Sequence, residues 1–197
     1  MRTTIALAVA ALATIALATT SAAAAPGPAE SPQVEAWYTP LDPTMRPIGP
    51  RRPATPLGAT AAERLDGPGR TTQGGRRLQS ASGCAAVDVS RIGRSSIVRS
   101  VVYKWHQVKG WCWSAGKVTR VDISTYPSDV DPNWRYRGQL PGSGGYYAWN
   151  GAGSGHWSLR QGSFENCILK YGCIGSEYPW VKVWVHGDGT YAYETGT

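Results

Sequence analysis

The chain has 197 residues and a formal net charge of +7, from 20 Lys and Arg against 13 Asp and Glu. This length allows one modest folded domain with flanking segments. The charge is mild and forms no dense stripe of Lys and Arg, which excludes the electrostatic pattern of a nucleic-acid-binding protein.

Residues 1–25 have the pattern of a secretory signal peptide. Arg2 precedes an apolar run from Ile5 to Ala18, and small residues follow up to Ala25. A basic start, a short apolar region and a small-residue cleavage site are typical of such peptides. The run is short for a membrane span of ~20 residues, and no basic stop-transfer cluster follows. We expect export, signal cleavage and no membrane span in the mature chain.

Residues 26–82 are predicted to be a Pro- and Arg-rich disordered linker or a pro-region. They hold ten of the fourteen prolines and almost no apolar periodicity. Such a stretch cannot bury enough apolar surface to offset the entropy cost of ordering. Cleavage near Arg76-Arg77 would make it a pro-peptide. The apolar island Val34–Tyr38 offers an alternative, in which this part docks on the folded domain.

Residues 83–197 hold all four cysteines and 18 of the 20 aromatic residues. Their aliphatic residues are twelve Val, five Ile and three Leu, and β-branched side chains favour strands. Dense Gly, Asn and Asp mark turns. We predict an all-β, sandwich-like domain of about eight short antiparallel strands.

Alternation of apolar and polar residues locates these strands. In one of them Tyr103 and Trp105 share a face, and Lys104 and His106 share the other. In chain order, the predicted strands are Ala86–Ser90, Ile97–Val108, Lys117–Thr125, Trp134–Arg137, Tyr146–Trp149, His156–Arg160, Trp180–His186 and Thr190–Thr195.

The four cysteines of an exported domain predict two disulfides. Cys167 and Cys173 are six residues apart with Gly172 between them, which favours a local pair. That leaves Cys84 with Cys112. The rival arrangement joins Cys84 to one of the late cysteines. No paired CxxC spacing is present, so we expect no zinc site.

The last two predicted strands are joined through Asp188-Gly189, a strong signal for a two-residue hairpin turn. That turn would place Val185 opposite Ala192 and Trp184 opposite Tyr193. The three valines from 181 to 185 would then face the core. The opposite face would carry the predicted binding residues Trp180, Lys182, Trp184, His186, Tyr191 and Tyr193.

The aromatic composition suggests what such a face does. Nine Trp and ten Tyr stand against a single Phe, and Trp and Tyr carry a polar group that needs a hydrogen bond or water. We interpret the face as a platform on which sugar rings stack. The leading hypothesis is therefore a secreted, non-catalytic domain that binds an extracellular carbohydrate or cell-wall polymer. The alternative is that a second sheet or the linker covers this face.

No sequence motif commits the chain to catalysis, because nucleophile elbows, metal-protease helices and phosphate loops are all missing. Spacing favours no carboxylate pair, and no Ser–His–Asp set built on His106, His156 or His186 stands out. We predict no catalytic residue, cofactor or metal ligand. Asp129–Asn133 starts like a calcium loop, but Trp134 replaces the required Gly, so we expect an Asx-Pro turn. A secreted hydrolase with an unidentified carboxylate or His site remains an alternative function.

A further alternative is a protein-interaction or inhibitory domain that uses the Cys167–Cys173 loop as an exposed finger. Four segments of the folded domain stand out: Val101–Gln107, Val130–Trp134, Cys167–Gly175 and Tyr178–Gly189. They resemble a group of secreted, disulfide-bonded β-rich proteins of high-GC Gram-positive bacteria. The resemblance covers the folded domain, implies export and a disulfide-bonded β fold, and transfers no catalytic residue.

Overall fold

A computed structural model describes residues 33–54, 82–95, 99–151, 153–168 and 171–197. These ranges form eleven strands and no helix. In chain order the strands are β1 (Val34–Leu41), β2 (Arg52–Pro53), β3 (Ser82–Arg94), β4 (Val101–Ser114), β5 (Lys117–Ser128), β6 (Trp134–Gln139), β7 (Ser143–Trp149), β8 (Gly153–Ile168), β9 (Gly172–Glu177), β10 (Trp180–His186) and β11 (Tyr191–Gly196).

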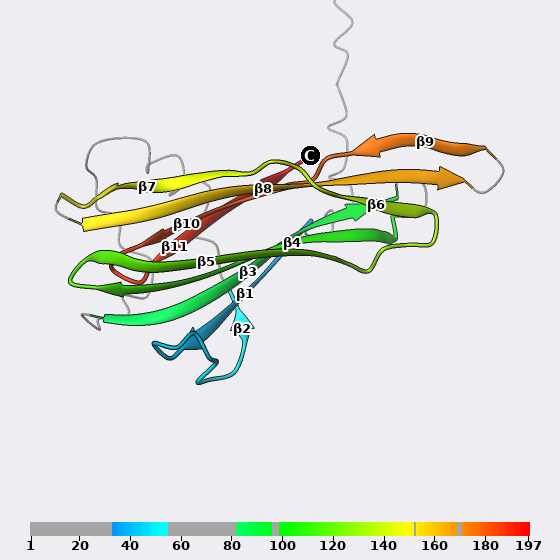
Figure 1. The fold of residues 1–197 in the computed structure, drawn as a ribbon. Coiled ribbons are helices and arrows are strands. Elements are labelled where there is room, and N and C mark those ends of the chain that lie inside the picture. Colours follow the sequence, from blue (N-terminus) through cyan, green and yellow to red (C-terminus); the bar gives the residue numbers. More distant parts are fainter. Residues whose placement is uncertain (1–32, 55–81, 96–98, 152, 169–170) are drawn as a thin grey trace, which may run out of the picture. The chain divides into compact units, whose positions relative to one another are not determined.

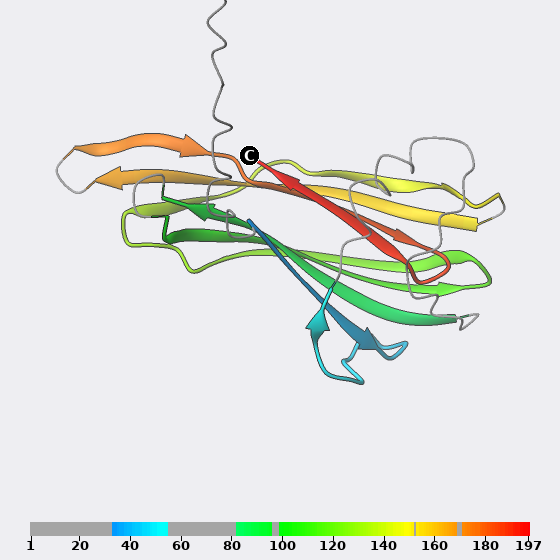
Figure 2. The same cartoon turned by 180° about the vertical axis from the view of Figure 1, so that it is seen from behind.

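The strands form two antiparallel sheets, which lie as two layers in both views (Figure 1, Figure 2). We call the five-stranded sheet, in the order β2-β1-β3-β4-β5, the first sheet. The six-stranded second sheet has the order β11-β10-β8-β6, and β7 and β9 also pair with β8. The predicted all-β sandwich is confirmed, although β4 and β8 are longer than expected at 14 and 16 residues.

The folded domain begins earlier than predicted. Strand β1 lies inside the predicted linker and pairs with β3 along its whole length, from Val34 opposite Arg91 to Leu41 opposite Cys84. The disorder predicted for this part is wrong, and the docking alternative is confirmed. The physical reason is alternation, since Val34, Ala36 and Tyr38 all pack against the buried core. The rest of the predicted linker, residues 55–81, and the predicted signal peptide lie outside the described residues.

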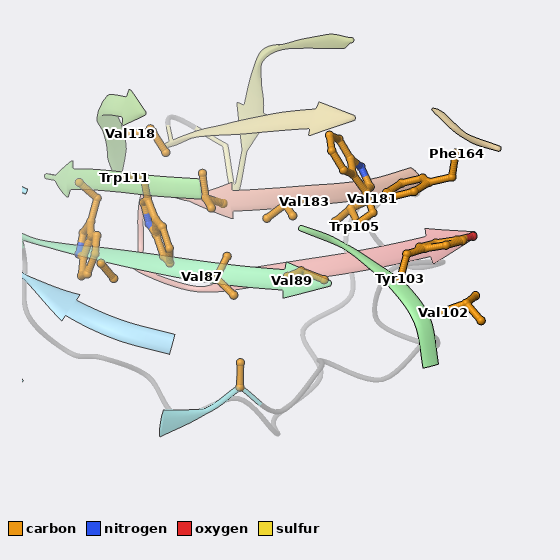
Figure 3. Close-up of a cluster of buried hydrophobic side chains, with 14 residues drawn as sticks. Val87, Val89, Val102, Tyr103, Trp105, Trp111, Val118, Phe164, Val181 and Val183 are labelled. Atoms are coloured by element: carbon orange, nitrogen blue, oxygen red, sulfur yellow. The ribbon is translucent and has the colours of Figure 1, made fainter. Parts of the chain in front are cut away.

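The core between the two sheets combines valines with large rings (Figure 3). The inward faces of β3 and β10 supply Val87, Val89, Val181 and Val183, all fully buried. The rings come from β4 and β8: Tyr103, Trp105, Trp111 and Phe164. Burial of one such side chain stabilises the fold by roughly 1.5–3 kcal/mol. These inward residues match the faces predicted for β4 and β10.

An ionisable residue, Lys109, also points into this layer. Lys109 of β4 is fully buried, and its Nζ donates hydrogen bonds to the carbonyl oxygens of His156 (2.8 Å) and Val183 (2.9 Å). Burial, with Arg160 adding its charge, lowers the pKa of Lys109 to about 6. A neutral amine keeps two N–H donors, which the two carbonyls satisfy. Lys109 therefore joins the first sheet to the second without a buried charge at neutral pH.

Both predicted disulfides are present. Cys84–Cys112 joins directly opposed residues of β3 and β4, and Cys167–Cys173 joins opposed residues of β8 and β9. Each disulfide of this kind contributes roughly 2–4 kcal/mol, mainly by restricting the unfolded chain. The rival pairing of Cys84 with a late cysteine is wrong. Disulfides persist in oxidising compartments, which agrees with an extracellular location.

At one corner the backbones of the two sheets meet directly. Ser154 N donates to Gly116 O (3.1 Å), and Gly187 N donates to Ser154 O (2.9 Å). Val118 N donates to Ser154 Oγ (2.9 Å). A Cβ atom at Gly187 would collide with Gly116 O, so this approach requires glycine. Across the described ranges, no helix is long and apolar enough to cross a membrane.

Candidate ligand-binding face

The hairpin that carries the predicted binding residues has a different register from the expected one. His186 N donates to Thr190 O (3.0 Å), so three residues form the loop, with Gly189 at a φ of 82°. Val185 lies opposite Tyr191 and Val183 opposite Tyr193. Three-residue loops with a left-handed Gly are a common hairpin alternative to the two-residue turn. The shift of one residue moves every β11 side chain to the other face.

Tyr191 and Tyr193 therefore lie on the inner side of the hairpin, and the prediction that they share the binding face is wrong. Both pack against the core. The Tyr191 ring stacks on Tyr38 with centroids 5.9 Å apart, and its edge meets Trp111 at 6.0 Å. Burial raises the pKa of Tyr191 to about 12. These two tyrosines are structural residues that help β1 and β11 to close the sandwich.

Three of the predicted residues do face outward from the second sheet. Trp180, Lys182 and Trp184 alternate with the buried valines of β10 and are half-buried. The neighbouring strand β8 places Trp157 directly opposite Trp184. We call the outward set the aromatic face; it consists of Tyr147, Trp149, Trp157, Trp180, Lys182 and Trp184.

Lys182 holds a central position on the aromatic face. Its Nζ lies 4.4 Å from the ring centroid of Trp184 and 5.3 Å from that of Trp157. A cation this close to an indole is attracted by the negative face of the ring. Lys182 therefore orients both rings and adds a positive charge between them. This agrees with the predicted placement of a cation among the rings of this face.

Two glycines allow rings to lie against the sheet. The Tyr147 ring occupies the space that a side chain at Gly155 would fill, and the Trp180 ring does the same at Gly196. Aromatic side chains that cover a strand glycine in this way restore the packing that glycine lacks. The rings thus form a layer on the sheet instead of projecting from it.

His186 is fully buried, so the prediction that it offers a polar contact to a ligand is wrong. The Trp149 ring stacks on its imidazole with centroids 3.7 Å apart, and its Nδ1 lies 2.8 Å from Thr190 Oγ1. Burial lowers the pKa of His186 to about 4, which keeps the ring neutral at pH 7. Its Nε2 is buried without a hydrogen-bond partner, as are Trp149 Nε1 and Tyr147 Oη.

Sequence reasoning missed Trp157, Tyr147 and Trp149 as members of this face. The alternation in β8 was visible, but nothing in the sequence says which set of side chains points inward. In the structure, Ser158 faces inward and bonds Gln107 of the first sheet. The polar set of β8 thus lies between the sheets, which leaves Trp157 outside.

A second cluster lies on the outward face of the first sheet. We call it the polar network; its members are Arg51, Asp88, His106, Tyr126 and Ser128. Asp88 Oδ1 lies 2.9 Å from His106 Nδ1, and Asp88 Oδ2 accepts from Arg51 (2.7 Å) and Tyr126 (2.9 Å). Burial acts to raise the pKa of Asp88, but these hydrogen bonds and charges outweigh it and hold the pKa below its ordinary value.

Metal-binding capacity is limited in the described part of the chain. Glu165, Cys167 and Cys173 lie close enough together to ligate an ion, but the two cysteines are joined in a disulfide and offer no thiolate. The predicted Asx turn is confirmed, since Asp131 Oδ1 accepts from Asn133 N (2.8 Å).

At the β8–β9 hairpin, Tyr171 is 78% exposed and Ile174 is 61% exposed. A role of this hairpin in protein binding stays a prediction.

Comparison with known proteins gives no match to a protein family, to a curated protein or to a solved structure. The resemblance to secreted proteins of Gram-positive bacteria stays a prediction.

Proposed function

We propose that this chain is a secreted domain that binds an extracellular carbohydrate or cell-wall polymer through the aromatic face. The pairing of Trp184 with Trp157 around Lys182 carries the proposal. Sugar rings present apolar faces edged by hydroxyl groups, so an indole can stack on the ring while a cation or amide engages a hydroxyl. Export through the predicted signal peptide belongs to the same proposal, and the two disulfides support it.

The layout of the face supports a polymer over a small ligand. Trp180 and Trp184 lie four residues apart on one strand, which separates them by about 13 Å. Trp157 extends the same surface across to β8. Rings spaced along a strand can contact successive units of one chain. A flat, half-buried row of rings suits an extended polymer better than a single small molecule.

Retention on insoluble polysaccharides and on peptidoglycan tests the proposal. We expect wild-type protein to be retained by at least one of them, and Trp184→Ala to weaken retention about tenfold, which corresponds to about 1.4 kcal/mol. Trp184→Phe keeps a stacking ring and should retain most of the affinity.

Tyr171→Ala provides the matched control, because it removes an exposed ring that lies off the aromatic face. Near-UV circular dichroism and thermal melting would verify that each variant is folded. Wild-type protein that binds none of these polymers, or Trp184→Ala that binds as wild type does, would refute the proposal.

A further inference from the structure

Asp88, His106 and Ser128 form a continuous chain of hydrogen bonds across three neighbouring strands. Asp88 of β3 contacts His106 Nδ1 at 2.9 Å, and His106 Nε2 lies 2.9 Å from Ser128 Oγ at the end of β5. A carboxylate on one imidazole nitrogen and a hydroxyl on the other is the arrangement that activates a serine as a nucleophile. The distances are within the range in which a proton moves between such groups.

The polar network fixes the tautomer of His106. The Asp88 carboxylate can only accept hydrogen bonds when ionised, and its lowered pKa keeps it ionised at neutral pH. Nδ1 of His106 therefore carries a proton, and Nε2 is the nitrogen that faces the Ser128 hydroxyl. The Tyr126 ring stacks on the imidazole with centroids 4.3 Å apart and planes at 9°, which holds the ring in this orientation.

The three residues differ in solvent exposure, and the serine, as the nucleophile, must be the one that a substrate can approach. Asp88 is 9% exposed and His106 is 7% exposed, whereas Ser128 is half-buried at the outward face. The acid and the base are thus shielded from water, which strengthens their interaction. Ser128 is therefore the most solvent-exposed of the three residues.

A group of charged side chains lies beside the serine. Lys104 is directly opposite Ser128 in the β4–β5 register, and its side chain shares the outward face with His106. Its Nζ is held by Glu35 (3.2 Å) and Asp129 (3.1 Å). Directly opposed residues have Cβ atoms about 5 Å apart. Lys104 is therefore a cation in register with Ser128, and two carboxylates share its charge.

We propose that Ser128, His106 and Asp88 form a hydrolytic triad for carboxylic esters. Ser128 Oγ attacks the ester carbonyl carbon while its proton passes to His106 Nε2. The negative charge then rests on the former carbonyl oxygen. The bond from carbon to the alcohol oxygen then breaks, and the departing oxygen takes the proton from Nε2. Water attacks the acyl-serine by the same route, which releases the carboxylic acid and restores the Ser128 hydroxyl.

Esters are the substrate class because the cation in register with Ser128, Lys104, shares its charge with two carboxylates and so stabilises an oxyanion weakly. An ester carbonyl is more electrophilic than an amide carbonyl and needs less stabilisation of this kind. The position at an open sheet face favours acyl groups carried on a large molecule. The proposal is independent of the aromatic face, which belongs to the other sheet.

Labelling with a fluorophosphonate probe tests the triad. Ser128 Oγ would displace fluoride and form a phosphonate ester, located by mass spectrometry of the Ser128 peptide. We expect labelling of the disulfide-bonded wild-type protein, none in Ser128→Ala and at least about a hundredfold slower labelling in His106→Asn. Hydrolysis of p-nitrophenyl acetate should fall in parallel.

Ser124→Ala serves as the control, because Ser124 lies on the outward face of the same strand four residues earlier and is exposed. It should behave as wild type does. Failure of the wild type to be labelled, or equal labelling of Ser128→Ala, would overturn the triad. Retention of Ser128→Ala on polysaccharide would be unchanged in either case, so a failed triad and a failed binding face are distinguishable.

Discussion

The two outward faces of the sandwich are built on the same alternation but work through different interactions. On the second sheet, the Trp157 and Trp184 rings are held by their contacts with one cation, Lys182. On the first sheet, Asp88, His106 and Ser128 are held by directional hydrogen bonds to single atoms. A smaller side chain on the aromatic face reduces the contact area only in part. In the polar network, removal of one hydrogen-bonding group interrupts the whole path of proton transfer. The two faces should therefore respond very differently to conservative substitution.

The largest expected effect is on the polar network. Asp88→Asn keeps the size of the side chain but removes the charge that selects the His106 tautomer and stabilises its protonated form. We expect ester hydrolysis, measured as kcat/KM with p-nitrophenyl acetate, to fall by a factor of about a hundred or more. Retention on polysaccharide should not change. A loss of less than a few-fold would assign Asp88 a purely structural role.

A second prediction concerns Lys109, which lies in the buried layer between the two sheets. Between pH 6 and pH 9 the unfolded chain holds a proton on Lys109 that the folded protein, with its pKa of about 6, does not. Proton binding at Lys109 stabilises the unfolded state relative to the folded state, and this stabilisation weakens as the pH rises. The free energy of unfolding should therefore rise with pH, by up to about 1.4 kcal/mol per unit from this residue.

Urea denaturation at several pH values would measure this slope, and Lys109→Met should flatten it. Variants of either outward face, such as Trp184→Ala, should keep the wild-type slope. The same slope in Lys109→Met and wild type would mean that Lys109 remains protonated inside the fold.

The smallest expected effect is on the aromatic face. Lys182→Gln removes the cation between Trp157 and Trp184 but leaves both rings in place. We expect polymer binding, measured by depletion from solution, to weaken about two- to fivefold, as for a cation–π contact of about 0.5–1 kcal/mol. Lys117→Gln, at an exposed lysine near the β4–β5 turn, should bind as wild type does. A larger loss than that of Trp184→Ala would mean that charge, and not stacking, dominates binding.

Much of the sandwich could be predicted from local pattern. Alternation located the strands from β3 onward except β9, and it assigned the valines of β10 to the core. The Cys167–Cys173 disulfide followed from cysteine spacing, and Cys84–Cys112 followed as the remaining pair; both join partners in adjacent strands. Strand β1 was missed because Pro, Arg and charged residues surround it, and its apolar face becomes useful only when β3 lies beside it.

The candidate sites depend on information that is not local. Asp188-Gly189 indicated a hairpin, but only the surrounding strands decide between loops of two and three residues, and that choice moved Tyr191 and Tyr193 inward. The triad residues are separated by 18 and 22 positions, and strand pairing alone brings them together. The number of residues between a serine, a histidine and an aspartate on adjacent strands depends on the lengths of the hairpins that join them. No fixed sequence spacing therefore identifies such a set on a sheet.

The corner formed by Gly116, Ser154 and Gly187 bears on self-association. A strand edge with free amide groups is a template on which a second chain can add its own strand. At this corner the amides of Val118, Ser154 and Gly187 already donate within the molecule. Those three amides offer nothing to a neighbouring chain. The amide of Val118 on the edge strand β5 is thereby unavailable for pairing with a strand of a second chain.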